Sequence, residues 1–252
     1  MTALICGVLV GLILTLIGGG GSVLAVPLMV YVVGVKDPHI AIGTSALAVA
    51  VNALFGLFTH ARAGNVGWRC GFAFAAAGVI GAALGSTIGK EVNGQRLLLL
   101  FALVMILVGV LMLKNRHAKG VENVQCTFQR MPRVLGFGAL AGLFSGFFGI
   151  GGGFLIVPGL ISATGMTMLA AVGTSLVAVT AFGLTTALNY ARAGLVDWPL
   201  SAQFILGGLA GGQLGAVLAR RLAARRGALS TLFAGAVFAV AAYMIWRGLG
   251  MA

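Results

Sequence analysis

Residues 18–27 read GGGGSVLAVP, and residues 149–158 read GIGGGFLIVP. Each stretch places a run of glycines inside a long uncharged part of the chain, residues 1–35 and 134–191 respectively. A glycine costs a helix about 1 kcal/mol relative to alanine, so a run of glycines disfavours a continuous helix. We therefore expect each of the two uncharged regions to be broken at its glycines.

The composition places the chain in a lipid bilayer. Apolar residues make up 60% of the 252 residues, and charged residues make up 8%, where a soluble domain carries about 25%. Such a chain cannot cover a water-facing surface, which excludes a soluble enzyme or binding module. The net charge of +12 comes from short basic clusters between uncharged stretches, a pattern typical of membrane-edge anchors and not of a nucleic-acid-binding surface.

Several uncharged stretches have the length of a membrane-spanning helix, which crosses about 30 Å of hydrocarbon in about 20 residues. Five stretches match this length: 40–59, 70–89, 97–113, 198–219 and 227–246. Residues 1–35 do not match, because one helix of that length would extend about 52 Å. The sequence therefore predicts an all-α polytopic membrane protein in which the glycine-broken regions are subdivided.

The two glycine-broken regions begin two copies of one unit. Three motifs recur in the same order: Val-Pro at 26–27 and 157–158, Gly-Thr-Ser at 43–45 and 173–175, and Ala-Arg-Ala-Gly at 61–64 and 191–194. The offset is 131 residues for the first motif (158 − 27) and 130 for the others (173 − 43, 191 − 61). We divide the chain into a first membrane repeat over 3–113, a polar cytoplasmic linker over 114–133 and a second membrane repeat over 134–247.

The distribution of Lys and Arg favours inverted repeats. If each glycine-broken segment crosses the membrane, the two sides carry 7 and 9 basic residues. If each segment is a re-entrant hairpin whose halves reach only the midplane, the sides carry 5 and 11, which restores the cytoplasmic excess expected of membrane proteins. Each repeat then has one re-entrant segment and three spanning helices, and the odd number of crossings inverts the second repeat. One long kinked helix at each break, with parallel repeats, is the alternative.

The glycine runs are candidate anion-binding sites. A half-helix that begins at Ser22 or Gly153 would present unpaired N–H groups and a partial charge of about +0.5 near the membrane centre. Hydroxyls of the Gly-Thr-Ser motifs could donate to the same anion, although such hydroxyls also bond to their own helical turn. The glycines could instead serve close helix packing. The substrate-binding candidates are Gly20, Gly21, Ser22, Thr44, Ser45, Gly151, Gly152, Gly153, Thr174 and Ser175.

Four further polar residues are candidates along the path of a solute. Arg62 and Arg192 occupy matched positions and could draw anions into two vestibules, or could anchor the protein at the interface. Asn52 and Asn189 are candidates for lining the path. None of the four acidic residues lies inside a predicted span, which argues against a cation carrier. We find no catalytic set, metal-ligand cluster or cofactor motif, and we predict no catalytic residue, metal or cofactor.

The doubled order of glycine run, Val-Pro, Gly-Thr-Ser, Ala-Arg-Ala-Gly and Trp extends over nearly the whole chain and resembles the TauE/SafE family of bacterial membrane proteins. This is the sulfite exporter and transmembrane sulfur transporter group. The resemblance implies a multi-pass protein of the bacterial inner membrane that exports a small sulfur-containing anion such as sulfite or an organosulfonate. The motifs are specific for the family and not for one substrate.

The residues and the resemblance together predict alternating access to a midplane site formed by half-helix N-termini. The expected partners are a small-anion substrate and the lipid bilayer, with no nucleic acid. The sequence allows either a monomer or an oligomer. The alternatives are transport of another small anion or of a cation, or a role as an intramembrane enzyme or assembly factor.

Overall fold

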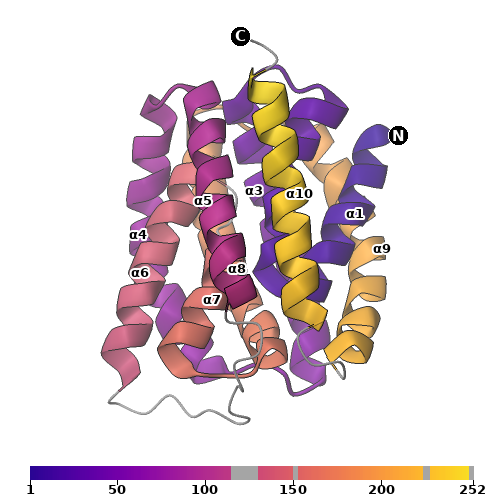
Figure 1. Cartoon of the computed structure of the whole chain (residues 1–252). Coiled ribbons are helices and arrows are strands. Elements are labelled where there is room, and N and C mark those ends of the chain that lie inside the picture. Colours follow the sequence, from indigo (N-terminus) through magenta and orange to yellow (C-terminus); the bar gives the residue numbers. More distant parts are fainter. Residues whose placement is uncertain (115–129, 150–152, 224–227, 250–252) are drawn as a thin grey trace.

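The computed structural model describes residues 1–114, 130–149, 153–223 and 228–249, and within these ranges the elements are all helical (Figure 1). The first half of the chain contains α1 (Thr2–Ile17), η1 (Gly18–Leu24), α2 (Ala25–Pro27), η2 (Leu28–Val33), α3 (Pro38–Arg62), α4 (Trp68–Glu91) and α5 (Gly94–Lys114). The second half contains α6 (Met131–Phe148), α7 (Gly153–Thr164), α8 (Met168–Arg192), α9 (Trp198–Ala223) and α10 (Ala228–Leu249).

Helices α3, α4, α6, α8 and α9 each contain an apolar segment long enough to cross a membrane. The outward surface carries large apolar side chains, with Ile80 and Leu214 exposed by 67% and 63%. Such residues are stable at a surface that lipid covers. The prediction of an all-α polytopic membrane protein is therefore confirmed, and α5 and α10 coincide closely with the predicted stretches 97–113 and 227–246.

The first glycine break differs in position from the one predicted. Helix α1 ends at Gly18, whose φ of 72° favours glycine, and the chain then continues helically through η1, α2 and η2 to Val33. The half-helix that was predicted to begin at Ser22 therefore begins four residues earlier, because Gly19–Gly21 adopt the tighter turns of a 3₁₀ helix. In the second half, Gly149 ends α6 with a φ of 65°, and α7 begins at Gly153 as predicted.

The first helix of each half packs on a helix of the other half. Helix α1 lies against α9, and α6 lies against α4. The backbones approach closely at glycines, since a Cβ on Gly11 would collide with Gly208 and a Cβ on Gly142 would collide with Gly78. The two contacts are related by the repeat offsets (142 − 11 = 131 and 208 − 78 = 130). Helices α3 and α8 also pack together, as do α5 and α10, which lie side by side at the front of Figure 1.

Helices α6 and α7 form a hairpin. Arg130 Nη1 donates a hydrogen bond of 2.6 Å to the carbonyl oxygen of Thr164, which joins the start of α6 to the end of α7. At the other end, Gly149 lies against Ile42 in the second turn of α3. The hairpin is longer than the predicted half-span, since α6 alone has the 18 residues of a candidate span. The glycines of α6 let it pack closely along α4 from Gly138 to Gly146.

Candidate functional site

Gly18, the turn between α1 and η1, is the tip of the first glycine-broken segment. It meets the Gly-Thr-Ser motif of the second half. A Cβ on Gly18 would lie 2.7 Å from Ser175 Oγ and 2.9 Å from Val172 Cα. Ser22 lies one turn further along η1 and is fully buried. Gly18 and Ser175 therefore form a buried junction between the two halves, which we call the first tip junction, and Ser22 follows it in η1.

The other predicted site glycines that the structure describes lie just after the tips of the two glycine-broken segments. Gly20 and Gly21 lie within η1, two and three residues after the tip. Gly153 is the first residue of α7 and follows the second tip, where Gly149 contacts Ile42. The predicted residues Gly151 and Gly152 lie outside the described residues.

Thr44 and Thr174 each hold the loop that precedes a helix of the other half. Thr44 Oγ1 accepts a 2.9 Å hydrogen bond from the backbone N–H of Asp197, and Thr174 Oγ1 accepts one of 2.9 Å from Gly67. Both threonines are fully buried. These bonds fix the entries to α9 and α4, a structural role that the sequence reasoning missed. An accepting hydroxyl keeps its own proton, which it can donate.

The two serines of the motifs bond within their own helices. Ser45 Oγ donates to the carbonyl oxygen of Ile42 at 3.0 Å, and Ser175 Oγ donates to that of Val172 at 2.8 Å. This is the local pattern that serine adopts in membrane helices. The bond to its own turn holds the Ser175 hydroxyl in position beside Gly18.

Arg62 and Arg192 are exposed at the C-terminal ends of α3 and α8. These two helices are antiparallel, because a Cβ on Gly43, near the start of α3, would meet Tyr190 near the end of α8. At the other end of the pair, Gly173 lies against Asn65. The two arginines therefore lie at opposite ends of the α3–α8 pair, as vestibule residues on opposite faces would.

Asn189 holds a lysine that the sequence reasoning did not select. Lys90 Nζ donates a 2.9 Å hydrogen bond to Asn189 Oδ1, while Asn189 Nδ2 donates to Ser86 Oγ at 2.7 Å and to Thr87 Oγ1 at 3.0 Å. The half-buried Lys90 is thereby held between α4 and α8. Its place directly after the span 70–89 is a sequence signal that could have identified it.

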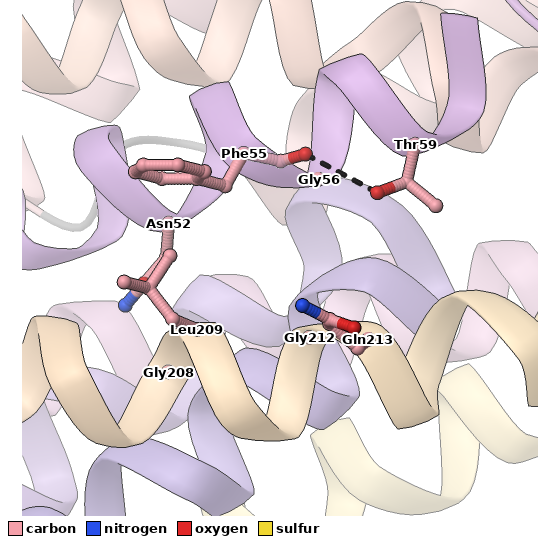
Figure 2. Close-up of a pocket in the computed structure, with 8 residues that line it drawn as sticks. All are labelled: Asn52, Phe55, Gly56, Thr59, Gly208, Leu209, Gly212 and Gln213. Carbon is pink, nitrogen blue, oxygen red and sulfur yellow. Dashed lines mark hydrogen bonds between the residues drawn. The ribbon is translucent and has the colours of Figure 1, made fainter. Parts of the chain in front are cut away.

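Asn52 lines a small cavity between α3 and α9. The residue is 3% exposed, and neither Oδ1 nor Nδ2 has a hydrogen-bond partner among the residues that the structure describes. Figure 2 shows it extending from α3 toward Gly208 of α9, with Gln213 on the same helix and Thr59 further along α3. The cavity has a volume of about 70 Å³. Within the described residues, no group of three or more His, Cys, Asp or Glu could hold a metal ion.

Comparison with known proteins gives one consistent result. The family model described as "Sulfite exporter TauE/SafE" matches residues 3–244. A "Probable membrane transporter protein" of Xylella fastidiosa strain Temecula1 is 54% identical over 242 residues, which cover 96% of this chain and 93% of that protein. The "Probable membrane transporter protein YdhB" of Bacillus subtilis is 27% identical over 82% of this chain and 85% of its own length. No solved structure matches this chain significantly.

Proposed function

The chain belongs to the TauE/SafE family, and on this premise we propose that it exports a small sulfur-containing anion, such as sulfite or an organosulfonate, across the bacterial inner membrane. The observation that carries the proposal is the first tip junction, where the glycine-rich start of a helical arm meets a serine of the other half inside the protein. No catalytic step is part of this function.

The proposed architecture has two inverted repeats, each with a re-entrant first segment. Three features support it. The contacts between α1 and α9 and between α6 and α4 are related by the repeat offsets, α3 and α8 are antiparallel, and Arg130 joins the two ends of the second hairpin. An inverted pair of repeats provides two alternative routes to one site, which is the basis of alternating access.

The proposed anion site is built from backbone groups. A bare anion in the membrane interior is very unstable, and neither η1 nor α7 carries a Lys or Arg that could neutralise it. Helical turns begin at Gly18 and Gly153, and the first N–H groups of a helix need a partner outside it and carry a partial charge of about +0.5. The two helix starts lie at opposite ends of the antiparallel α3–α8 pair, because Gly18 meets Val172 near the start of α8 and Gly149 meets Ile42 near the start of α3. Ser22 and Ser175 border the first of these helix starts. The proposed anion site therefore combines N–H groups with the two hydroxyls, and Arg62 and Arg192 attract the anion from either side.

The transport proposal is tested by reconstituting the purified protein alone in liposomes and measuring the flux of labelled sulfite, sulfate, thiosulfate and short sulfonates. We expect saturable flux of at least one sulfur anion and no flux of inorganic cations. If the protein transports only an anion without sulfur, the proposed substrate class is wrong. Cation flux would contradict the anion site itself.

We expect Gly20→Val and Gly152→Val to abolish anion binding while the protein stays folded. A branched side chain would fill the space in which the oxyanion meets the backbone. Binding is measured by calorimetry on detergent-purified protein, with a melting curve to verify folding. Gly136→Val is the matched control, since a Cβ at Gly136 meets no atom within 4 Å. Folded valine variants that bind as tightly as the parent would show that the glycine runs are packing devices.

Replacing Arg62 or Arg192 by Gln is expected to slow anion flux more at low than at high ionic strength. Salt screens long-range attraction, with a Debye length of about 10 Å at 0.1 M and about 30 Å at 0.01 M. Flux is compared at the two ionic strengths with osmolarity held constant. A loss of flux that does not depend on salt would assign the arginines to anchoring.

A further inference from the structure

The cavity at Asn52 is a chemical difference between the two halves of the molecule. Its lining comes from α3 and α9 (Figure 2). Within the described part of the chain, both carboxamide atoms of Asn52 lack a hydrogen-bond partner, although the residue is 97% buried. A buried polar group without a partner destabilises a folded protein, and more strongly where water is excluded. An arrangement of this kind is expected where a ligand completes the hydrogen bonds.

The related position in the second half is filled. Phe182 stands at the repeat equivalent of Asn52 (182 − 52 = 130), and Gly78 at that of Gly208. A Cβ on Gly78 would collide with the ring of Phe182, which stacks on Phe74 at a centroid distance of 6.3 Å. An aromatic ring thus occupies the α8–α4 crevice. In the α3–α9 crevice the Asn52 carboxamide likewise lies against Gly208, where a Cβ would collide with Nδ2, but a cavity remains beside this shorter side chain.

The cavity provides hydrogen-bond donors without a negative charge. Its polar side chains are the carboxamides of Asn52 and Gln213 and the hydroxyl of Thr59, which donates to the carbonyl oxygen of Phe55 at 3.4 Å. A carboxamide offers two N–H donors, and oxyanions accept such bonds. The volume of about 70 Å³ exceeds the roughly 10–15 Å³ that a cavity needs in order to hold one water molecule.

The cavity also lies on a route toward the proposed Arg62 vestibule. Asn52 precedes Arg62 by ten residues on the same helix, about 15 Å along its axis. Thr59 and the exposed Gln213 lie nearer the surface. Thr59 and Asn52 therefore follow α3 inward from the arginine, and Gln213 lines the same cavity from α9.

We propose that the α3–α9 crevice is a subsite of the transport path, in which Asn52 Nδ2 donates a hydrogen bond to an oxygen of the transported anion. The inference rests on the proposed function, which supplies the anion. Because Phe182 occupies the related crevice between α8 and α4, the carboxamide of this subsite has no counterpart there, and the two alternating routes are chemically different.

Asn52→Leu tests the subsite, since leucine keeps the approximate volume and removes both hydrogen-bonding atoms. Asn52→Phe copies the closed crevice of the second half. Thr186→Val is the matched control, because Thr186 is fully buried and its hydroxyl also lacks a partner, but it lies in the closed half. For each variant, KM for anion flux is measured in liposomes, and the melting temperature is measured in detergent with and without 10 mM sulfite.

We expect Asn52→Leu to melt at or above the temperature of the parent without anion, because an unpaired carboxamide has been removed. Its KM should rise at least tenfold, and its stabilisation by sulfite should be lost. Asn52→Phe should lose flux, and Thr186→Val should behave as the parent does. An unchanged KM in Asn52→Leu overturns the proposal. A lower melting temperature without anion, combined with a retained response to sulfite, also overturns it and assigns the amide to an ordered water.

A test independent of the substrate separates this inference from the proposed function. Asn52→Cys is reacted with an anionic and a cationic thiosulfonate reagent of similar size. Faster reaction with the anionic reagent supports the subsite even if the parent carries no sulfur anion. Faster reaction with the cationic reagent, or no reaction with either one, contradicts it.

Discussion

Thr44 and Thr174 show how single residues connect the two halves. Each hydroxyl accepts a hydrogen bond from a partly buried loop N–H of the other half. Thr44→Val and Thr174→Val leave that N–H without a partner, and we expect each to lower the free energy of unfolding by about 1–3 kcal/mol. Thermal melting in detergent measures the loss, and Thr→Ser at the same position should restore much of it.

Thr180→Val is the control for these variants, because the Thr180 hydroxyl donates only to the carbonyl oxygen of Leu176 in its own helix, at 2.8 Å. If Thr44→Val is no less stable than Thr180→Val, the bond between the halves contributes nothing to stability.

At the scale of the helices, glycine contacts determine how the two halves interlock. A side chain at Gly11 or Gly142 would collide with the carbonyl group of the facing helix. We expect Gly11→Val and Gly142→Val each to destabilise the protein by about 1–3 kcal/mol or more, the usual range for overpacking. Gly136→Val, which adds its side chain to open space on α6, should cost little in the same melting assay. Equal melting temperatures for all three variants would contradict the close approach.

At the scale of the whole molecule, the inverted arrangement predicts the side of each loop. Lys36, Arg192 and the C-terminus should face the periplasm, and Lys119 and Arg225 the cytoplasm, because only this assignment gives the asymmetry of 11 to 5 basic residues. Cysteines introduced at these positions are labelled in whole cells with an impermeant reagent. The three native cysteines, Cys6, Cys70 and Cys126, are first replaced by serine, so that the introduced cysteine is the one thiol that can react. Labelling of positions 192 and 119 from the same side would refute inversion.

The sequence by itself determined the solvent, the helical class and the positions of most helices. Composition and charge spacing are properties of the chain, and a membrane-spanning helix satisfies its backbone hydrogen bonds locally, so its length can be predicted without knowledge of its neighbours. The repeat offsets likewise indicated which helices are equivalent. Glycine content indicated a break near Gly18 but not its position, because the same residues permit both a turn and a 3₁₀ helix.

Only the tertiary structure decided which groups meet. Thr44 and Asp197 are 153 residues apart, and no local pattern indicates that the hydroxyl accepts from that N–H. The unpartnered amide of Asn52 is likewise a property of its surroundings, because the same residue facing a polar neighbour would be satisfied. Phe182 could be aligned with Asn52 from the sequence. Whether a cavity remains beside each side chain depends on its volume and on how closely the facing helix approaches. Contacts between distant segments depend on packing in three dimensions, which the order of residues does not display.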